Sequence, residues 1–277
     1  MAINRRTFLG TMTAATVLGS RLSWAAESRK IEKVGVQLYT VRDAMKADFP
    51  GTLAKVAKIG YREVEFAGLF DHTPQDVRKM LDSNGLTAAS SHIPYQNLSS
   101  GWEQTLDGAK TLGQSFIVCP SIDDDVLKQP DGWKRAAEAF NRAGEASKKV
   151  GLQFGYHNHT PEFTPTKDGK LPYDILLTET DPNLVTMEMD LFWIIKAGQD
   201  PLQYFNKYPG RFSLVHVKDM KKDGSMTDVG QGTIDWKAIF AQSDKAGIKH
   251  YFVEHDEPKS PFDDIRASFD YLQKLRF

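Results

Sequence analysis

Two histidines at the end of a short apolar run are the first residues of this chain whose types and spacing could do chemistry. Residues 152–163 contain His157 and His159, which are separated by one residue. If the run is a β-strand, successive side chains point to opposite faces, so both imidazoles lie on the same face. Paired imidazoles suit metal binding or proton transfer, and the competing interpretation is a pair of hydrogen-bonded core histidines.

Three later apolar runs also end in groups that can bind a metal ion, namely Asp190, His216 and Glu254. Two carboxylates and an imidazole form an oxygen and nitrogen donor set. That set suits Mn²⁺, Co²⁺, Zn²⁺ or Mg²⁺ and leaves positions open for a substrate. Either His157 or His159 would complete it. We therefore expect a divalent-metal site, because a buried trio of charged groups is costly unless a metal or mutual pairing compensates it.

Other residues near the ends of apolar runs are candidates for contacts with a substrate. Lys218 follows His216 by two residues and shares its face, so its ammonium could hold a substrate oxygen or stabilise an enolate. A solvated lysine at the rim is the competing interpretation. Glu65 and His92 could hydrogen-bond sugar hydroxyls. Trp193 could form an apolar wall for a sugar ring, although an aromatic residue in this position can also serve packing alone.

Two further carboxylates are expected to support the site. Glu188 shares the face of Asp190 one layer lower, so we expect it to be buried and paired inside the fold and not to bind the metal. Glu162 follows the two histidines closely and is expected to cap or orient one of them.

The elements that must position these residues alternate between strand and helix with a period of roughly 30 residues, which is typical of βα units. Eight such units predict a single (β/α)₈ TIM barrel. The competing doubly wound sheet is disfavoured because no Gly-rich phosphate-binding fingerprint follows the first strand. The strands are expected at 34–39, 63–66, 86–91, 115–120, 185–192, 212–217 and 249–254, with the fifth in 152–163. The helices are expected at 50–59, 74–81, 102–112, 133–150, 172–179, 201–207, 236–246 and 262–275.

The first 26 residues have the pattern of a twin-arginine export signal. Arg5 and Arg6 precede a mildly apolar run, and Ser23-Trp24-Ala25 offers small residues to a signal peptidase. The apolar run is too short to span a membrane, so no membrane anchor is expected. We therefore divide the chain into a signal peptide, 1–26, and a barrel, 27–277, with a periplasmic or secreted location.

Charge and cysteine content narrow the class of partner. Removal of the signal changes the formal charge from -1 to about -4, because it removes three arginines and no acid. An acidic chain without basic residues around the carboxyl ends of its strands is unsuited to bind nucleic acid, which argues against a metal-dependent endonuclease. A non-catalytic periplasmic sugar-binding protein would not need a metal-competent mouth. Because Cys119 is the single cysteine, no internal disulfide can form. The sequence is compatible with a monomer or a homo-oligomer.

The chain resembles the xylose isomerase-like barrels described as sugar phosphate isomerase/epimerase, a group that includes endonuclease IV, ketose 3-epimerases and inosose dehydratase. The motifs that carry the resemblance are 156–159 (Tyr-His-Asn-His), 189–193 (Met-Asp-Leu-Phe-Trp), 197–198 (Ala-Gly), 216–219 (His-Val-Lys-Asp), 229–236 (Val-Gly-Gln-Gly-Thr-Ile-Asp-Trp) and 253–254 (Val-Glu). The resemblance implies a divalent metal held at the ends of strands five to eight by His157, Asp190, His216 and Glu254.

One position departs from the epimerase-like members, whose fifth-strand ligand is a glutamate. Here His157 stands in that place, so only Glu254 remains of the two carboxylates that act as paired acid–base groups. We expect a metal to polarise a carbonyl and to stabilise the enediolate formed when His159 or Glu254 removes the neighbouring proton, with Lys218 assisting.

This chemistry predicts a sugar isomerase or epimerase that acts on a free sugar or keto-sugar. Sugar phosphates are scarce outside the cytoplasm, and Gly230-Gln231-Gly232 is better interpreted as a turn than as a phosphate-binding loop. The alternative is a dehydratase or lyase that eliminates from a keto-sugar, keto-inositol or keto-glycoside, because the same enediolate serves both outcomes.

Overall fold

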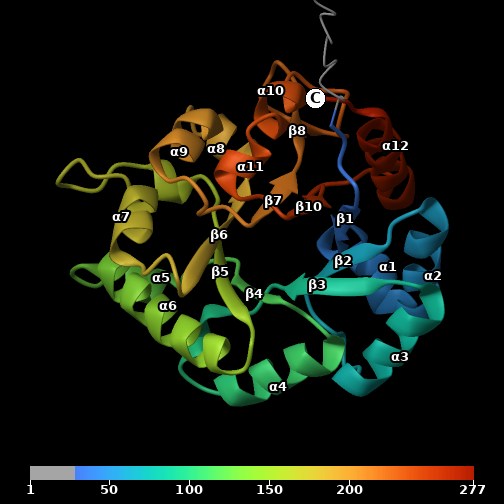
Figure 1. Ribbon diagram of the computed structural model, residues 1–277, viewed down its shortest axis with the longest axis horizontal. Helices are drawn as coiled ribbons and strands as arrows, with labels where there is room; N and C mark the ends of the chain where they lie inside the picture. Colours follow the sequence, from blue (N-terminus) through green and yellow to red (C-terminus); the bar gives the residue numbers. More distant parts are fainter. Residues whose placement is uncertain (1–28) are drawn as a thin grey trace, which may run out of the picture.

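The computed structural model describes residues 29–277, and within them eight parallel strands form one barrel surrounded by helices (Figure 1). The hydrogen-bonded order of the strands is β3-β2-β1-β10-β7-β6-β5-β4. A parallel bridge between His92 and Val118 joins β3 to β4 and closes the ring. The strands are β1 Val34–Gln37, β2 Glu63–Phe66, β3 Thr87–Ser91, β4 Phe116–Cys119, β5 Gln153–His157, β6 Val185–Asp190, β7 Leu214–Val217 and β10 His250–Val253.

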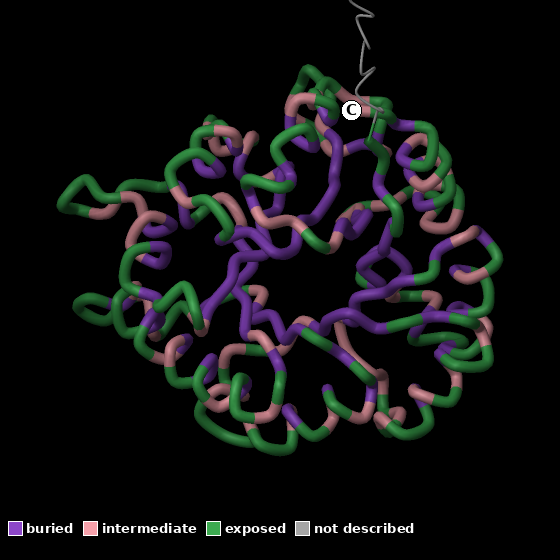
Figure 2. The backbone as a smooth tube through the Cα atoms, in the orientation of Figure 1, coloured by how far each residue is buried: buried purple, intermediate pink, exposed green. Residues whose placement is uncertain are grey.

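The helices lie outside this ring, and the strands are almost entirely buried between them and the barrel interior (Figure 2). Burial on both faces is why strands such as β4, Phe-Ile-Val-Cys, are apolar throughout. The helices are α1 Arg42–Ala47, α2 Phe49–Ile59, α3 Pro74–Asn84, α4 Trp102–Leu112, α5 Asp124–Leu127, α6 Gly132–Lys149, α7 Pro172–Glu179, α8 Leu191–Lys196, α9 Pro201–Lys207, α10 Trp236–Phe240, α11 Ser243–Ala246 and α12 Pro261–Lys274.

Local capping explains where several helices begin and end. The Asp48 side chain accepts a hydrogen bond from Gly51 N at the start of α2, and Thr73 does the same for Asp76 N at the start of α3. Helix α3 ends at Gly85, whose φ of 63° is the left-handed conformation that glycine adopts most easily. These signals can be read in the sequence, which is why most helix positions were predicted closely.

The predicted TIM barrel is confirmed, and the helix expected at 172–179 has those bounds as α7. The sixth strand is shorter than the expected 185–192, because it ends at Asp190. The Asp190 carboxylate accepts hydrogen bonds from Phe192 N and Trp193 N, both 2.9 Å long, and so begins α8 directly after the strand. Strand β1 likewise ends at Gln37, and residues Leu38–Val41 form a 3₁₀ turn.

The long connection between β7 and α10 is folded around one buried carboxylate. It contains a small hairpin of β8 Asp219–Met220 and β9 Met226–Thr227. The Asp219 carboxylate accepts hydrogen bonds from Gly230 N at 2.8 Å, Gly232 N at 3.1 Å and the Trp236 indole at 3.0 Å. A side chain at Gly232 would meet Asp219 Oδ1 at 2.1 Å. The Gly-Gln-Gly segment therefore wraps a carboxylate of its own chain, as its interpretation as a turn requires.

None of the helices within residues 29–277 is long and apolar enough to cross a membrane. The export signal predicted at 1–26 lies outside the described residues and stays a prediction, as does the domain boundary that depends on it.

Candidate active site

The carboxyl ends of the strands surround a cavity of about 470 Å³, the position in which barrels of this kind build their sites. The site residues that line it lie at the carboxyl ends of strands or in the segments that follow them, on several sides of the ring. They are Tyr39, His92, His157, His159, Trp193, Lys218, Glu254 and Asp256. The expected candidates therefore gather at one mouth, except for Glu65, Asp190 and His216, which lie just beneath it with no exposed surface.

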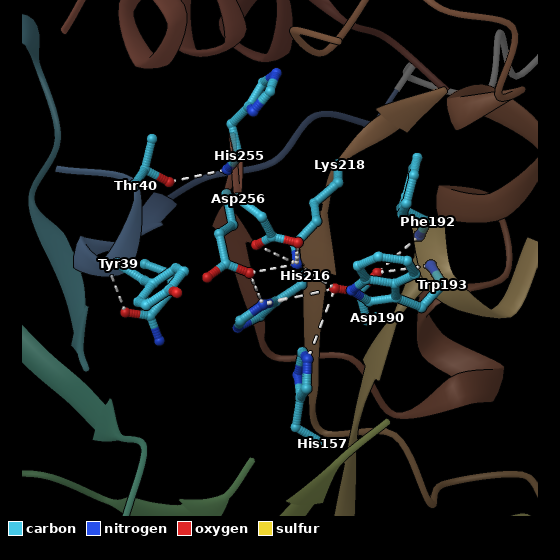
Figure 3. A network of polar contacts seen from close by, with 12 residues as sticks. Tyr39, Thr40, His157, Asp190, Phe192, Trp193, His216, Lys218, His255 and Asp256 are labelled. Atoms are coloured by element: carbon cyan, nitrogen blue, oxygen red, sulfur yellow. Dashed lines mark hydrogen bonds and ion pairs between the residues drawn. The ribbon is translucent and has the colours of Figure 1, made fainter. Parts of the chain in front are cut away.

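The four predicted metal ligands lie together at the floor of this cavity. His216 Nδ1 is 2.7 Å from Glu254 Oε2 and 3.9 Å from Asp190 Oδ2. His157 Nε2 is 3.7 Å from the same Asp190 oxygen. Figure 3 shows His157, Asp190 and His216 pointing toward one another from neighbouring strands. In the described chain, His157 and not His159 is therefore the fifth-strand residue that faces the two later ligands.

Lys218 places an ammonium between the carboxylates of this group. Its Nζ is 2.6 Å from Glu254 Oε2, 2.8 Å from Asp190 Oδ2 and 3.0 Å from Asp256 Oδ1. The side chain is 1% exposed, so it is not a solvated lysine at the rim. Asp256 was not among the expected site residues. It follows Glu254 by two residues and so shares its face, which is the signal that could have revealed it.

A second layer of polar groups lies directly below. Glu188 Oε2 is 3.0 Å from His157 Nδ1, 3.2 Å from His216 Nε2 and 2.7 Å from His92 Nε2. Glu65 Oε1 is 2.7 Å from His216 Nε2 and 3.1 Å from His92 Nε2. Glu188 is paired inside the barrel, as expected. Glu65 has no exposed surface, so its position beneath the mouth does not support the substrate contact predicted for it.

The charges of this network shift the pKa values of its titrating groups away from their ordinary values. Burial raises the pKa of Glu254, but the neighbouring Lys218 and His216 hold it well below its usual range. Burial lowers the pKa of Lys218, but Asp190 and Glu254 raise it above its ordinary value. In His216 the charges of Glu188 and Glu254 likewise outweigh burial and raise the pKa. Glu254 is therefore an ionised, doubly paired carboxylate and a weak base.

His159 has the opposite character. Burial, followed by the positive charge of Lys218, lowers the pKa of His159 to about 4, so its imidazole is neutral near pH 7. Its ring lies 4.8 Å from that of His157 and 5.9 Å from that of Trp193, centroid to centroid. Glu162 Oε2 accepts a hydrogen bond of 2.9 Å from His159 N and so fixes the backbone, as expected for an orienting carboxylate.

The residues on the floor fit a divalent cation. Asp190, His216 and Glu254 each offer a donor atom within 4.8 Å of the others, and all three are buried. Within residues 29–277, Asp190 Oδ2 is a buried oxygen without a hydrogen-bond partner, although it lies 2.8 Å from the Lys218 ammonium. The carboxylates of Asp190, Glu254 and Asp256 share the one Lys218 ammonium. The surroundings of Lys218 therefore carry more negative than positive charge. Carboxylate and imidazole donors in this arrangement suit Mn²⁺, Co²⁺ or Zn²⁺.

Comparison with protein families matches residues 53–275 to the family described as "Xylose isomerase-like TIM barrel". This chain belongs to that family. A crystal structure from Parabacteroides distasonis of the same fold, described as a sugar phosphate isomerase/epimerase, is 31% identical to it. The match covers 91% of this chain and 95% of the other, with a TM-score of 0.76. The resemblance inferred from the motifs is confirmed.

Curated relatives of this chain are named for a reaction. An inosose dehydratase from Lacticaseibacillus casei is 25% identical over 266 residues, which are 81% of this chain and 88% of the relative. Another, from Geobacillus kaustophilus, is 26% identical over 269 residues, which are 80% of this chain and 86% of the relative.

These names correct the main functional expectation, and the sugar isomerase or epimerase predicted from the sequence is wrong. The curated relatives are dehydratases, and a dehydratase is a carbon–oxygen lyase. The geometry supplies a physical reason. Glu254 is held by His216 and Lys218, and the fifth strand offers His157 in place of a second carboxylate. The mouth formed by residues 29–277 therefore does not provide the pair of free carboxylate bases that symmetric epimerisation uses.

Proposed function

We propose that this chain is a metal-dependent dehydratase, a carbon–oxygen lyase that eliminates water from a keto-inositol or a closely related keto-sugar. The observation that carries the proposal is the asymmetry of the mouth. At its floor the Glu254 carboxylate is paired with His216 and Lys218, whereas the neutral imidazole of His159 faces the cavity. The dehydratase names of the curated relatives support the same reaction class and substrate class.

A divalent metal held by His157, Asp190, His216 and Glu254 would polarise the substrate carbonyl and so make the neighbouring C–H bond more acidic. We assign Mn²⁺, Co²⁺ or Zn²⁺ to this site on the chemistry of its donors. The remaining steps are performed by the side chains that face the cavity.

His159 acts as the base and then as the acid. Its neutral imidazole removes the proton on the carbon next to the carbonyl, and the electron pair of the broken C–H bond forms an enolate. The imidazolium then returns a proton to the hydroxyl on the next carbon. As the C–O bond breaks, a C=C bond forms and water leaves. One group can serve both steps because each begins with His159 in the protonation state that the other leaves behind.

Lys218 and Trp193 position the substrate. The Lys218 ammonium remains charged because three carboxylates surround it, so it can stabilise a developing negative charge on oxygen. The Trp193 ring lies 5.7 Å from this ammonium and borders the cavity, where it offers an apolar face to a carbocyclic or sugar ring. A ring with a ketone and neighbouring hydroxyls matches this combination of a cation and an aromatic wall.

The test compares two histidine variants on a keto-inositol substrate with Mn²⁺, followed by the ultraviolet absorbance of the conjugated ketone that dehydration forms. We expect His159→Gln to lower kcat by roughly 10²–10⁴-fold and to retain Mn²⁺, because it removes a general acid–base group and no ligand. His255→Gln is the matched control, since this nearby imidazole points away from the cluster (Figure 3) and should keep full activity. Equal activity of both variants would contradict the assignment.

The proposed location is outside the cytoplasm. The paired arginines and the small-residue cleavage site at the beginning of the chain support it.

A further inference from the structure

The two histidines of the proposed metal site each touch a buried carboxylate with the nitrogen that points away from the other ligands. We propose that Glu188 and Glu65 are positioning residues that hold His157 and His216 in opposite tautomers, so that His157 binds metal through Nε2 and His216 through Nδ1. This inference rests on the metal site of the proposed function and concerns residues beneath it.

The contacts of His157 assign its tautomer. Its Nδ1 lies 3.0 Å from Glu188 Oε2, and its Nε2 lies on the other side, 3.7 Å from Asp190 Oδ2. A carboxylate only accepts hydrogen bonds, so the proton of a neutral His157 belongs on Nδ1. The lone pair of Nε2 is then directed toward Asp190 and is free to bind a cation.

The contacts of His216 are reversed. Its Nε2 lies 2.7 Å from Glu65 Oε1 and 3.2 Å from Glu188 Oε2. Its Nδ1 lies 2.7 Å from Glu254 Oε2 on the side of the ligand carboxylates. When a cation occupies that side, the remaining proton belongs on Nε2, where the Glu65 carboxylate accepts it.

Other side chains keep both carboxylates in place. Gln37 Nε2 donates to Glu65 Oε1 at 2.6 Å, and the Ser90 hydroxyl donates to the other oxygen of Glu65. His92 Nε2 lies within 3.1 Å of Glu65 and 2.7 Å of Glu188, and so joins the two. Neither carboxylate has exposed surface, so neither can contact a substrate. Their effect on the site must pass through the histidines.

Such carboxylate–histidine pairs orient the ring and increase the basicity of the ligating nitrogen, and their loss costs about 10–100-fold in metal affinity. The same atoms could instead bind a second ion below the first, since His92, His157, Glu188 and His216 also offer donors within 4.8 Å of one another. That arrangement would require both shared histidines to bridge two ions through both nitrogens. The hydrogen-bonded arrangement needs no such bridge and is the one we propose.

Glu63 provides a matched control for removing a buried carboxylate. It is also on β2 and 2% exposed, and its Oε2 lies 2.9 Å from the Nδ1 of another histidine, His250. Neither residue lines the cavity or touches the ligand group. Glu63→Gln therefore removes a buried Glu–His pair of the same kind without affecting the site.

The first measurement is calorimetric titration of the metal-free chain with Zn²⁺, with no substrate present. We expect one Zn²⁺ per chain, an affinity about 10–100-fold weaker for Glu188→Gln and for Glu65→Gln, and an unchanged affinity for Glu63→Gln. Wild-type affinity in both folded site variants, an equal loss in the Glu63 variant, or two Zn²⁺ ions per wild-type chain would each overturn the proposal.

The second measurement needs no variant, so it holds even if a substitution prevents folding. Proton–nitrogen NMR spectra of the Zn²⁺-loaded wild-type chain should show His157 protonated on Nδ1 and His216 protonated on Nε2. The same tautomer in both histidines would overturn the proposal. Neither measurement uses a substrate. A chain that shows these tautomers but does not dehydrate a keto-inositol would therefore contradict the proposed reaction and leave the positioning role intact.

Discussion

His157 and Glu254 determine which acid–base groups the mouth can offer. Strand β5 ends in an imidazole, His157, and the Glu254 carboxylate is paired with His216 and Lys218. His159 offers a neutral imidazole to the cavity, and we propose it as the group that removes a proton from a bound substrate. At the scale of single residues, this asymmetry supports the proposed one-sided proton abstraction followed by elimination.

Glu63, at the start of β2 and outside the cavity lining, allows a test of how buried charges contribute to stability. Burial raises the pKa of Glu63, but its hydrogen bonds to His250 and Lys33 lower it below the ordinary 4.5. Its pairing therefore stabilises the fold above the pKa of the unfolded chain, and this contribution is lost as the pH falls through the lower folded pKa.

We expect Glu63→Gln to be less stable than the wild type by about 1.5–3 kcal/mol at pH 7, the range for a hydrogen bond to a charged group. The difference should shrink as the pH falls below about 4. Thermal unfolding of both proteins between pH 7 and pH 3 measures it. A difference that grows toward low pH would show that the sign of this linkage is wrong.

At the scale of elements, sequence patterns predicted the order of strands and helices but not where hydrogen bonds would end them. Strand β6 ends at Asp190, two residues before its expected end, because the Asp190 carboxylate caps the start of α8. The positions of the metal-binding candidates at the ends of predicted strands, together with a spacing of two for Lys218, placed them at one mouth. These patterns could not show that Glu65 lies too deep for a substrate, since depth depends on the stagger of the strands.

The β7–α10 connection depends on Asp219, which accepts hydrogen bonds from Gly230 N, Gly232 N and the Trp236 indole through one oxygen. Asp219→Asn would place an amide group against these donors. We expect it to cost about 3 kcal/mol and to lower Tm by roughly 6–12 °C. Asp223→Asn, in an exposed turn of the same connection, is the control and should leave Tm unchanged. An unshifted Tm in Asp219→Asn would show that this carboxylate does not hold the loop.

At the scale of the whole molecule, the barrel followed from the sequence because eight apolar strands alternating with capped helices have few other solutions. The reaction did not follow so directly. Isomerisation and elimination share an enolate, so the strand-end residues alone do not distinguish them, and the proposed elimination rests in part on the pairing of Glu254 with Lys218. That contact joins the ends of β7 and β10, the seventh and eighth barrel strands, and only the folded chain shows it.

Export through the twin-arginine route is a second proposed property of the whole molecule, and it can be tested directly. We expect replacement of both Arg5 and Arg6 by Lys to leave the precursor in the cytoplasm, because the twin-arginine route depends on the paired arginines. Cell fractionation and immunoblotting measure the distribution of the wild type and the variant. Normal accumulation of the double variant outside the cytoplasm would contradict this assignment.

The central claim is that this family member removes water and does not rearrange its substrate. The most direct measurement is the mass spectrum of the product formed from a keto-inositol by the Mn²⁺-loaded chain, with the chelator-treated chain as control. We predict a product that has lost one water and forms only with the metal. A product of unchanged mass, whether an isomer or an epimer, would contradict it.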